Sequence, residues 1–109
     1  MRRGIGWLTA IGCLATIAGP ARAEDAAVTE GRRIAHGACS PCHAVGPTGA
    51  SPRAEAPPFR DLGHKYPVEN LEEALAEGVV VGHPGMPEVK MNEREIAAFV
   101  AWLKTVQMP

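Results

Sequence analysis

The chain has 109 residues, of which 46% are hydrophobic and 21% charged, so it is long enough for one small domain and too short for two. Its 11 basic residues face 12 acidic ones, a formal charge of −1. No basic excess therefore points to nucleic acid as a partner, and multidomain enzyme architectures are disfavoured.

The first 23 residues have the three parts of a secretory signal peptide. Two arginines near the start are followed by an apolar run and then by Ala-Arg-Ala, which ends at Ala23. We expect cleavage after Ala23, export to the periplasm and a mature domain of residues 24–109 with no transmembrane segment. An uncleaved anchor is the alternative, although the run is short for a bilayer span. A lipoprotein signal at Cys13 fits less well, because that cysteine lies inside the apolar run.

Removal of this segment makes the domain smaller and more acidic. It takes away three arginines and no acidic residue, so 8 basic residues remain against 12 acidic ones, a charge of −4. The mature domain keeps two cysteines, Cys39 and Cys42, which are too close in sequence to close a useful loop. A domain this small with few aromatic residues usually needs a metal or a cofactor to complete its core.

The first half of the mature chain is predicted to contain a helix, a long loop and a short helix. The first helix is expected from Thr29 or Glu30 to Ala38. Residues 46–58 include six prolines and glycines, which indicates a loop. Residues 59–65 are expected to form one or two helical turns.

A further helix is predicted over residues 68–77. Pro67 suits its first turn, acidic side chains lie near its positive end, and Gly78 provides the stop. Three valines at 79–81 could suggest a strand, but glycines and prolines follow at once and no second strand is available to pair with it. We therefore expect an apolar loop there.

The last helix has the clearest signals. Asn92 is a good N-cap, and Glu95 three residues later completes a capping box. Apolar residues then recur at helical spacing, at positions 96, 99, 100, 103 and 106. The predicted fold is therefore all-α, with short helices joined by long loops.

The sequence C-x-x-C-H at residues 39–43 indicates the chemistry of the site. Cysteines at i and i+3 on a helical turn face the same way, so Cys39 and Cys42 can bond to the two vinyl groups of one haem. His43 then projects its imidazole toward the iron. A covalent haem also supplies the core that the few aromatic residues do not.

Three other interpretations of the two cysteines have less support in the sequence. A thioredoxin-type redox pair needs a preceding strand, and none is predicted. A zinc site would have to use Cys42 and His43 together and recruit His36 or His64. A plain disulfide is the third alternative. Export favours haem, which is attached in an oxidising compartment.

The mature chain resembles the class I cytochrome c family along nearly its whole length. Residues 31–35 are similar to the N-terminal helix of the family, 39–43 to its haem-attachment site and 56–59 to the segment beside the proximal histidine. Residues 83–87, His-Pro-Gly-Met-Pro, resemble the distal methionine loop, and 99–104 the C-terminal helix that crosses the first. The resemblance implies that fold, with one covalently bound haem c.

Met86 is the predicted ligand opposite His43. Its flanking prolines and glycine make a loop that can be held against the haem, and a soft thioether favours ferrous iron. Met91 directly precedes the Asn92 cap, and Met108 lies at the chain end. His83 is a weaker candidate ligand, because at three residues before Met86 it is expected to form a hydrogen bond near a haem edge or to face solvent.

Further residues are assigned around the haem. The resemblance implies that the Pro57 carbonyl accepts the second N–H of His43. Candidates for the apolar haem wall are Phe59, Leu62, Leu75, Phe99 and Leu103. The four glutamates of the 68–77 region are expected to form a solvated face.

The sequence therefore predicts an exported monohaem electron carrier that is a monomer, is not an enzyme and exchanges single electrons with redox partner proteins. Two alternatives remain open. One is a haem enzyme or gas-binding protein with an open distal site, similar to a peroxidase. The other is a haem subunit of a dehydrogenase complex.

Overall fold

The computed structural model describes residues 4–109 except 5, 8, 18 and 79–82, and within this part of the chain all regular elements are helical. In chain order these are α1 (Pro20–Ile34), the π-helix η1 (Ala35–Cys39), the 3₁₀ helices η2 (Phe59–His64) and η3 (Val68–Asn70), α2 (Leu71–Glu77) and α3 (Glu93–Thr105). The predicted all-α class is confirmed. The valine stretch 79–81, predicted to be a loop, lies outside the described residues.

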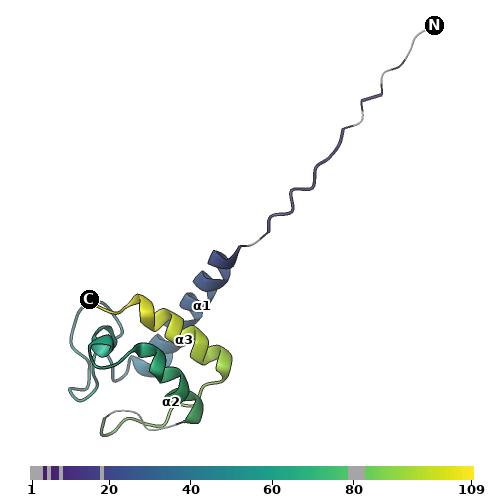
Figure 1. The fold of residues 1–109 in the computed structure, drawn as a ribbon. Coiled ribbons are helices and arrows are strands. Elements are labelled where there is room, and N and C mark those ends of the chain that lie inside the picture. Colours follow the sequence, from purple (N-terminus) through teal and green to yellow (C-terminus); the bar gives the residue numbers. More distant parts are fainter. Residues whose placement is uncertain (1–3, 5, 8, 18, 79–82) are drawn as a thin grey trace.

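Helix α1 differs from its prediction at both ends. It begins at Pro20, well before Thr29, because proline suits the first helical position and the residues after it are mostly alanine, arginine and acids that tolerate a helix. Its α-helical part ends at Ile34, and the chain then widens into η1, which reaches Cys39 rather than stopping at Ala38. Residues 9–17, which precede α1, extend away from the folded body (Figure 1).

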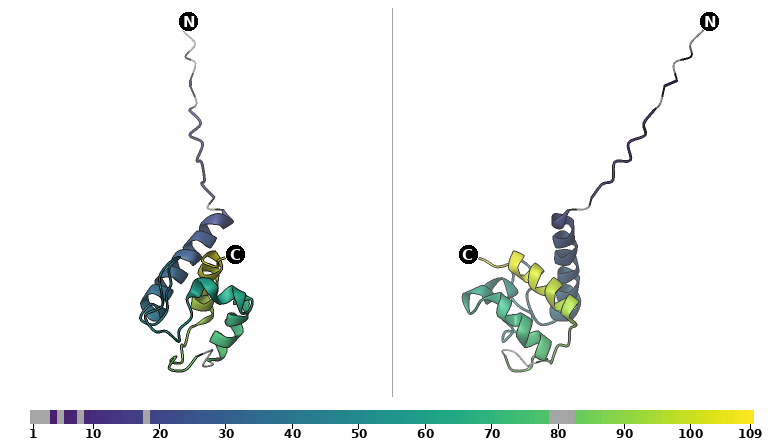
Figure 2. Two further views of the ribbon diagram at one scale, coloured as in Figure 1. Left: turned by 90° about the vertical axis from the view of Figure 1, so that its left-hand side faces the viewer. Right: turned by 45° about the vertical axis from the view of Figure 1, so that its right-hand side comes forward.

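Helices α1 and α3 cross and pack against each other (Figure 2). Gly31 lies at the contact and is buried. A Cβ at this position would overlap the carbonyl of Ala98 and lie 2.7 Å from the Cβ of Trp102. The two backbones can therefore approach this closely only because residue 31 has no side chain.

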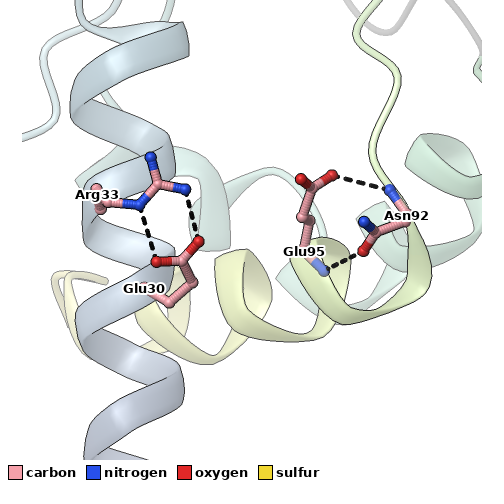
Figure 3. A network of polar contacts seen from close by, with 4 residues as sticks. All are labelled: Glu30, Arg33, Asn92 and Glu95. Carbon is pink, nitrogen blue, oxygen red and sulfur yellow. Dashed lines mark hydrogen bonds and ion pairs between the residues drawn. The ribbon is translucent and has the colours of Figure 1, made fainter.

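The capping box predicted for α3 is present (Figure 3). The Glu95 backbone N–H donates to Asn92 Oδ1 at 2.9 Å, and the Asn92 backbone N–H donates to the Glu95 carboxylate at 3.0 Å. The buried face of α3 includes four of the five positions predicted from spacing, at 96, 99, 100 and 103. Val106 is the C-cap and only half-buried.

The helix predicted over 68–77 begins as η3, continues as α2 and ends at Gly78, which has a left-handed φ of 69°. The chain end is attached to η2 by Gln107, whose amide donates to the Phe59 carbonyl at 2.8 Å and accepts the Gly63 N–H at 2.7 Å. This attachment holds η2 beside the end of α3. Among the described residues, no helix combines the length and apolar character that crossing a membrane requires.

Candidate functional site

A cavity of about 350 Å³ opens between η1, η2, α2, α3 and the loop 83–91. Its volume lies in the range of about 300–1,000 Å³ that is usual for cofactor pockets. Apolar side chains make up most of its lining, among them Phe59, Leu62, Leu75 and Phe99. Leu103, which was predicted to join this wall, does not line the cavity: it is completely buried in the core.

Cys39 and Cys42 both line this cavity and are half-buried. Cys39 ends η1, and the next turn is closed by hydrogen bonds from the Cys42 and His43 N–H groups to the Cys39 carbonyl, at 3.1 and 2.9 Å. Ser40 Oγ also donates to the His36 carbonyl. This turn places both thiols on the cavity side, and they are not joined by a disulfide.

The chemistry of the Cys39 thiol argues against a dithiol redox pair. Burial, with a smaller contribution from neighbouring Cys42, raises the pKa of the Cys39 thiol to about 11. Redox-active cysteines have the opposite property, a lowered pKa that maintains the thiolate. The strand that a thioredoxin motif requires is also absent from the described residues.

His43 is buried, with 7% of its surface exposed, and its ring is oriented by a hydrogen bond at Nδ1. Nδ1 lies 2.8 Å from the Pro57 carbonyl oxygen. A carbonyl can only accept, so Nδ1 carries the hydrogen, and Nε2 of the neutral ring carries the lone pair. Burial lowers the pKa of His43, which favours this neutral form. The hydrogen bond to Pro57 is the one implied by the resemblance.

Pro57 is held in place by the chain on either side of it. The Phe59 N–H donates to the Ala44 carbonyl at 3.0 Å, and the Arg53 N–H donates to the Cys42 carbonyl at 3.2 Å. These bonds pin the proline-rich loop alongside the C-x-x-C-H turn. The Phe59 ring then packs on His43, with centroids 4.6 Å apart and planes inclined by 34°.

The loop 83–91 forms the opposite side of the cavity and brings three potential ligands to it, His83, Met86 and Met91. The Met86 N–H donates to the His83 carbonyl at 3.3 Å, and Gly85 between them has a left-handed φ of 82°. Met91, expected to be badly placed because it precedes the helix cap, also lines the cavity and packs against the core.

The remaining histidines and Met108 lie away from the cavity. His36 and His64 are exposed, and His64 Nε2 is 3.1 Å from the Met108 carbonyl oxygen. Among the described residues there is no group of three or more His, Cys, Asp or Glu side chains that could hold a metal ion. The alternative zinc site with His36 or His64 therefore finds no support.

Sequence reasoning missed several residues of the cavity. Tyr66 is half-buried at its edge, where burial raises the pKa of its hydroxyl, and Lys65 and Glu55 also line it. Arg60 donates to the carbonyls of Gly46 and Gly49 and so braces the long loop. None of these residues belongs to a motif, so the sequence offered no signal for them.

A comparison with protein families decides the relationship: the Cytochrome c family matches residues 28–107, which is most of the chain. The chain belongs to the cytochrome c family. No curated protein and no solved structure matches it. Membership confirms the class I cytochrome c fold and one covalently bound haem c.

The residues of this cytochrome suit that cofactor. The cavity walls are mainly apolar, two thiols lie on one wall, and beside them a buried imidazole has its lone pair on the nitrogen that is not bonded to Pro57. Haem needs these three things: burial, sulfur atoms for attachment and an axial nitrogen. The described part of the chain therefore fits a haem.

Proposed function

We propose that this cytochrome is an exported one-electron carrier whose haem is attached through Cys39 and Cys42 and whose iron is held between His43 and Met86. The observation that carries the proposal is the pairing of the C-x-x-C-H turn with the Met86 loop across a single apolar cavity. When bound, the haem supplies an iron that cycles between the ferrous and ferric states.

Individual residues of the protein have separate roles around the haem. His43 binds the iron, and the Pro57 carbonyl fixes the orientation and tautomer of its ring. Phe59 and the other apolar side chains exclude water from the cavity. Met86 would supply a second ligand with a soft sulfur, which would favour the ferrous state and leave no site on the iron free for a substrate. These roles suit electron transfer rather than enzymatic turnover.

The attachment residues are tested by the haem content of cysteine variants. Trypsin should release residues 34–53 as one peptide that contains both cysteines and carries the mass of one haem. The Cys39→Ala/Cys42→Ala double variant should lose its haem to acidified acetone. Cys13→Ala is the matched control and should keep it, because Cys13 lies in the predicted signal segment. Haem retained by the double variant would refute the assignment.

The proposed export and cleavage have a separate test. The purified protein should begin at Glu24 and have the mass of residues 24–109 plus one haem. Cleavage there removes only the first turn of α1, whereas the α1 residues packed on the core begin farther along, with Val28. The domain should therefore stay folded after cleavage. A purified protein that retains residues 1–23 would favour the anchor.

The alternative of an enzyme with an open distal site predicts different ligand binding. A carrier with both axial positions filled should bind carbon monoxide and hydrogen peroxide poorly, because a ligand must first leave the iron. Rapid binding of carbon monoxide to the ferrous protein would favour the alternative. A free carrier should elute as a monomer and be reduced by free redox partners. A subunit of a dehydrogenase complex should instead be found only within that complex.

A further inference from the structure

His83 lies directly against His43 in the cavity. Its Nε2 is 3.4 Å from the His43 Nε2, and the two rings meet edge to face with centroids 5.3 Å apart. Met86, three residues later in the same loop, lines the cavity as well. The loop thus brings two different donors to the side of the cavity opposite His43.

The hydrogen bonds at Nδ1 of both rings determine whether the facing Nε2 atoms carry a hydrogen or a lone pair. His43 Nδ1 faces the Pro57 carbonyl at 2.8 Å, and His83 Nδ1 faces the Pro84 carbonyl at 3.1 Å. Carbonyl oxygens only accept, so both Nδ1 atoms carry the hydrogen, and in neutral rings both Nε2 atoms carry lone pairs. No N–H is then left to join the two facing Nε2 atoms.

Two facing lone pairs are the donor arrangement of two imidazoles on opposite sides of one metal ion. Imidazole nitrogens lie about 2.0 Å from a bound metal such as zinc, so an opposed pair is about 4 Å apart. The 3.4 Å separation is close to this value. A small outward movement of His83 would make room for an iron between the two nitrogens.

We infer that His83 is a reserve ligand, which binds the haem iron opposite His43 whenever the thioether of Met86 is not bound. This inference rests on the proposed ligation by His43 and Met86. In the exchange one iron–sulfur bond breaks and one iron–nitrogen bond forms. Both donors are neutral, so neither a proton nor an electron is transferred.

The turn that joins the two donors makes the exchange local. His83 and Met86 are linked by the hydrogen bond between the Met86 N–H and the His83 carbonyl, and Gly85 has the left-handed conformation that closes the turn. A shift of this single turn therefore exchanges one donor for the other. Thioether favours ferrous iron more than imidazole does, so the exchange should occur mainly in the oxidised protein.

The test compares the ferric spin state of Met86→Ala with that of two double variants by electron paramagnetic resonance. Met86→Ala should remain low-spin, because His83 takes the position. Met86→Ala/His83→Ala should be high-spin. Met86→Ala/His36→Ala is the matched control and should stay low-spin, because His36 is exposed and does not line the cavity.

A binding measurement with cyanide provides a second readout. If His83 occupies the iron in Met86→Ala for more than about nine-tenths of the time, its removal should tighten the apparent Kd for cyanide by at least about tenfold. Equal cyanide affinity in the single and double variants would overturn the inference. A high-spin Met86→Ala protein would overturn it too.

Failure of the inference can be told apart from failure of the proposed function. The wild-type ferric spectrum tests Met86, because only sulfur ligation gives the sulfur-to-iron charge-transfer band. A wild type with that band and a high-spin Met86→Ala variant would leave the proposed function intact and refute the reserve role of His83. A wild type without that band would refute the proposed ligation by Met86, on which the reserve role rests.

Discussion

At the scale of single residues, the site depends on contacts that orient His43. The Pro57 carbonyl accepts a hydrogen bond from Nδ1 of His43, and the Phe59 ring covers a face of the imidazole. Phe59 also contacts Phe99 and Trp102 edge to face, with centroids 5.8 and 6.1 Å apart. One aromatic side chain therefore connects the proposed iron ligand to the core.

Replacing Phe59 should disturb both stability and ligand orientation. Phe59→Leu should lower the free energy of unfolding by about 1–2 kcal/mol, because the aromatic contacts are lost and the smaller side chain packs less well. Guanidinium unfolding of the holoprotein measures this change. Ile96→Val is the control: it should cost about 0.5–1.5 kcal/mol but leave the ferric resonance signal unchanged, because Ile96 is buried in the core and does not line the cavity. Identical signals from both variants and the wild type would contradict this account.

The sequence was informative for residues whose role follows from a motif. The C-x-x-C-H turn and the Asn92 cap have local signatures, whereas the Pro57 acceptor was implied by the resemblance. The structure brings the residues of each together. Leu103 was misplaced because helical spacing identifies a buried face without saying which buried residues face a cofactor. The contact between His83 and His43 joins residues 40 positions apart, which spacing cannot predict.

At the scale of elements, the crossing of α1 and α3 determines how the first helix presents η1 to the cavity. The two helices can approach closely at this crossing because residue 31 is glycine. The resemblance identified the two helices but not the residue at their contact. The start of α1 at Pro20 is also earlier than predicted: residues 20–23 belong to the predicted signal segment, and residues 24–28 lack the apolar spacing that indicates a helix from Thr29 onward. Helix propensity does not stop at a cleavage site.

Gly31→Ala should destabilise the protein strongly. The added Cβ would overlap the Ala98 carbonyl, so the helices must separate, and we expect a loss of at least about 2 kcal/mol. Gly37→Ala in η1 is the matched control, because nothing lies within 4 Å of its Cβ position. That variant should be neutral or up to about 1 kcal/mol more stable. Thermal unfolding followed by circular dichroism compares them, and equal stabilities would contradict the close crossing.

The two helix caps allow another matched comparison. Asn92→Ala removes the capping box of α3 and should cost about 1 kcal/mol in the free energy of unfolding. Asn70 stands at the N-cap of α2 but its side chain makes no cap hydrogen bond, so Asn70→Ala should change stability by less than about 0.5 kcal/mol. Chemical denaturation measures both. A larger effect at Asn70 than at Asn92 would be inconsistent with the structure.

At the scale of the whole molecule, charge should govern how the proposed carrier meets its partners. The domain 24–109 has a charge of −4 before the haem propionates are counted. Glu72, Glu73 and Glu77 of α2 are exposed, and Glu69 pairs with Lys104 at 3.4 Å. Because Leu71 and Leu75 of the same helix line the cavity, these acids lie on the element that borders the site.

Electron transfer with a basic partner protein should therefore slow as salt is added. We expect the bimolecular rate to fall by about tenfold or more between low and high ionic strength, because exposed charges are screened. Stopped-flow measurements with a basic and an acidic partner test this. The Glu72→Lys/Glu73→Lys variant should weaken the dependence on salt. An electron-transfer rate that does not change with salt concentration would indicate that docking is mainly apolar.

The measurement that tests the central claim most directly is the absorption spectrum of the purified ferric protein, in the wild type and in Met86→Ala. Ligation by His43 and Met86 predicts a low-spin wild-type spectrum with the sulfur-to-iron charge-transfer band, and loss of that band in Met86→Ala. Met91→Ala should keep the band. A high-spin wild-type spectrum, or a band that disappears in Met91→Ala and persists in Met86→Ala, would contradict the account.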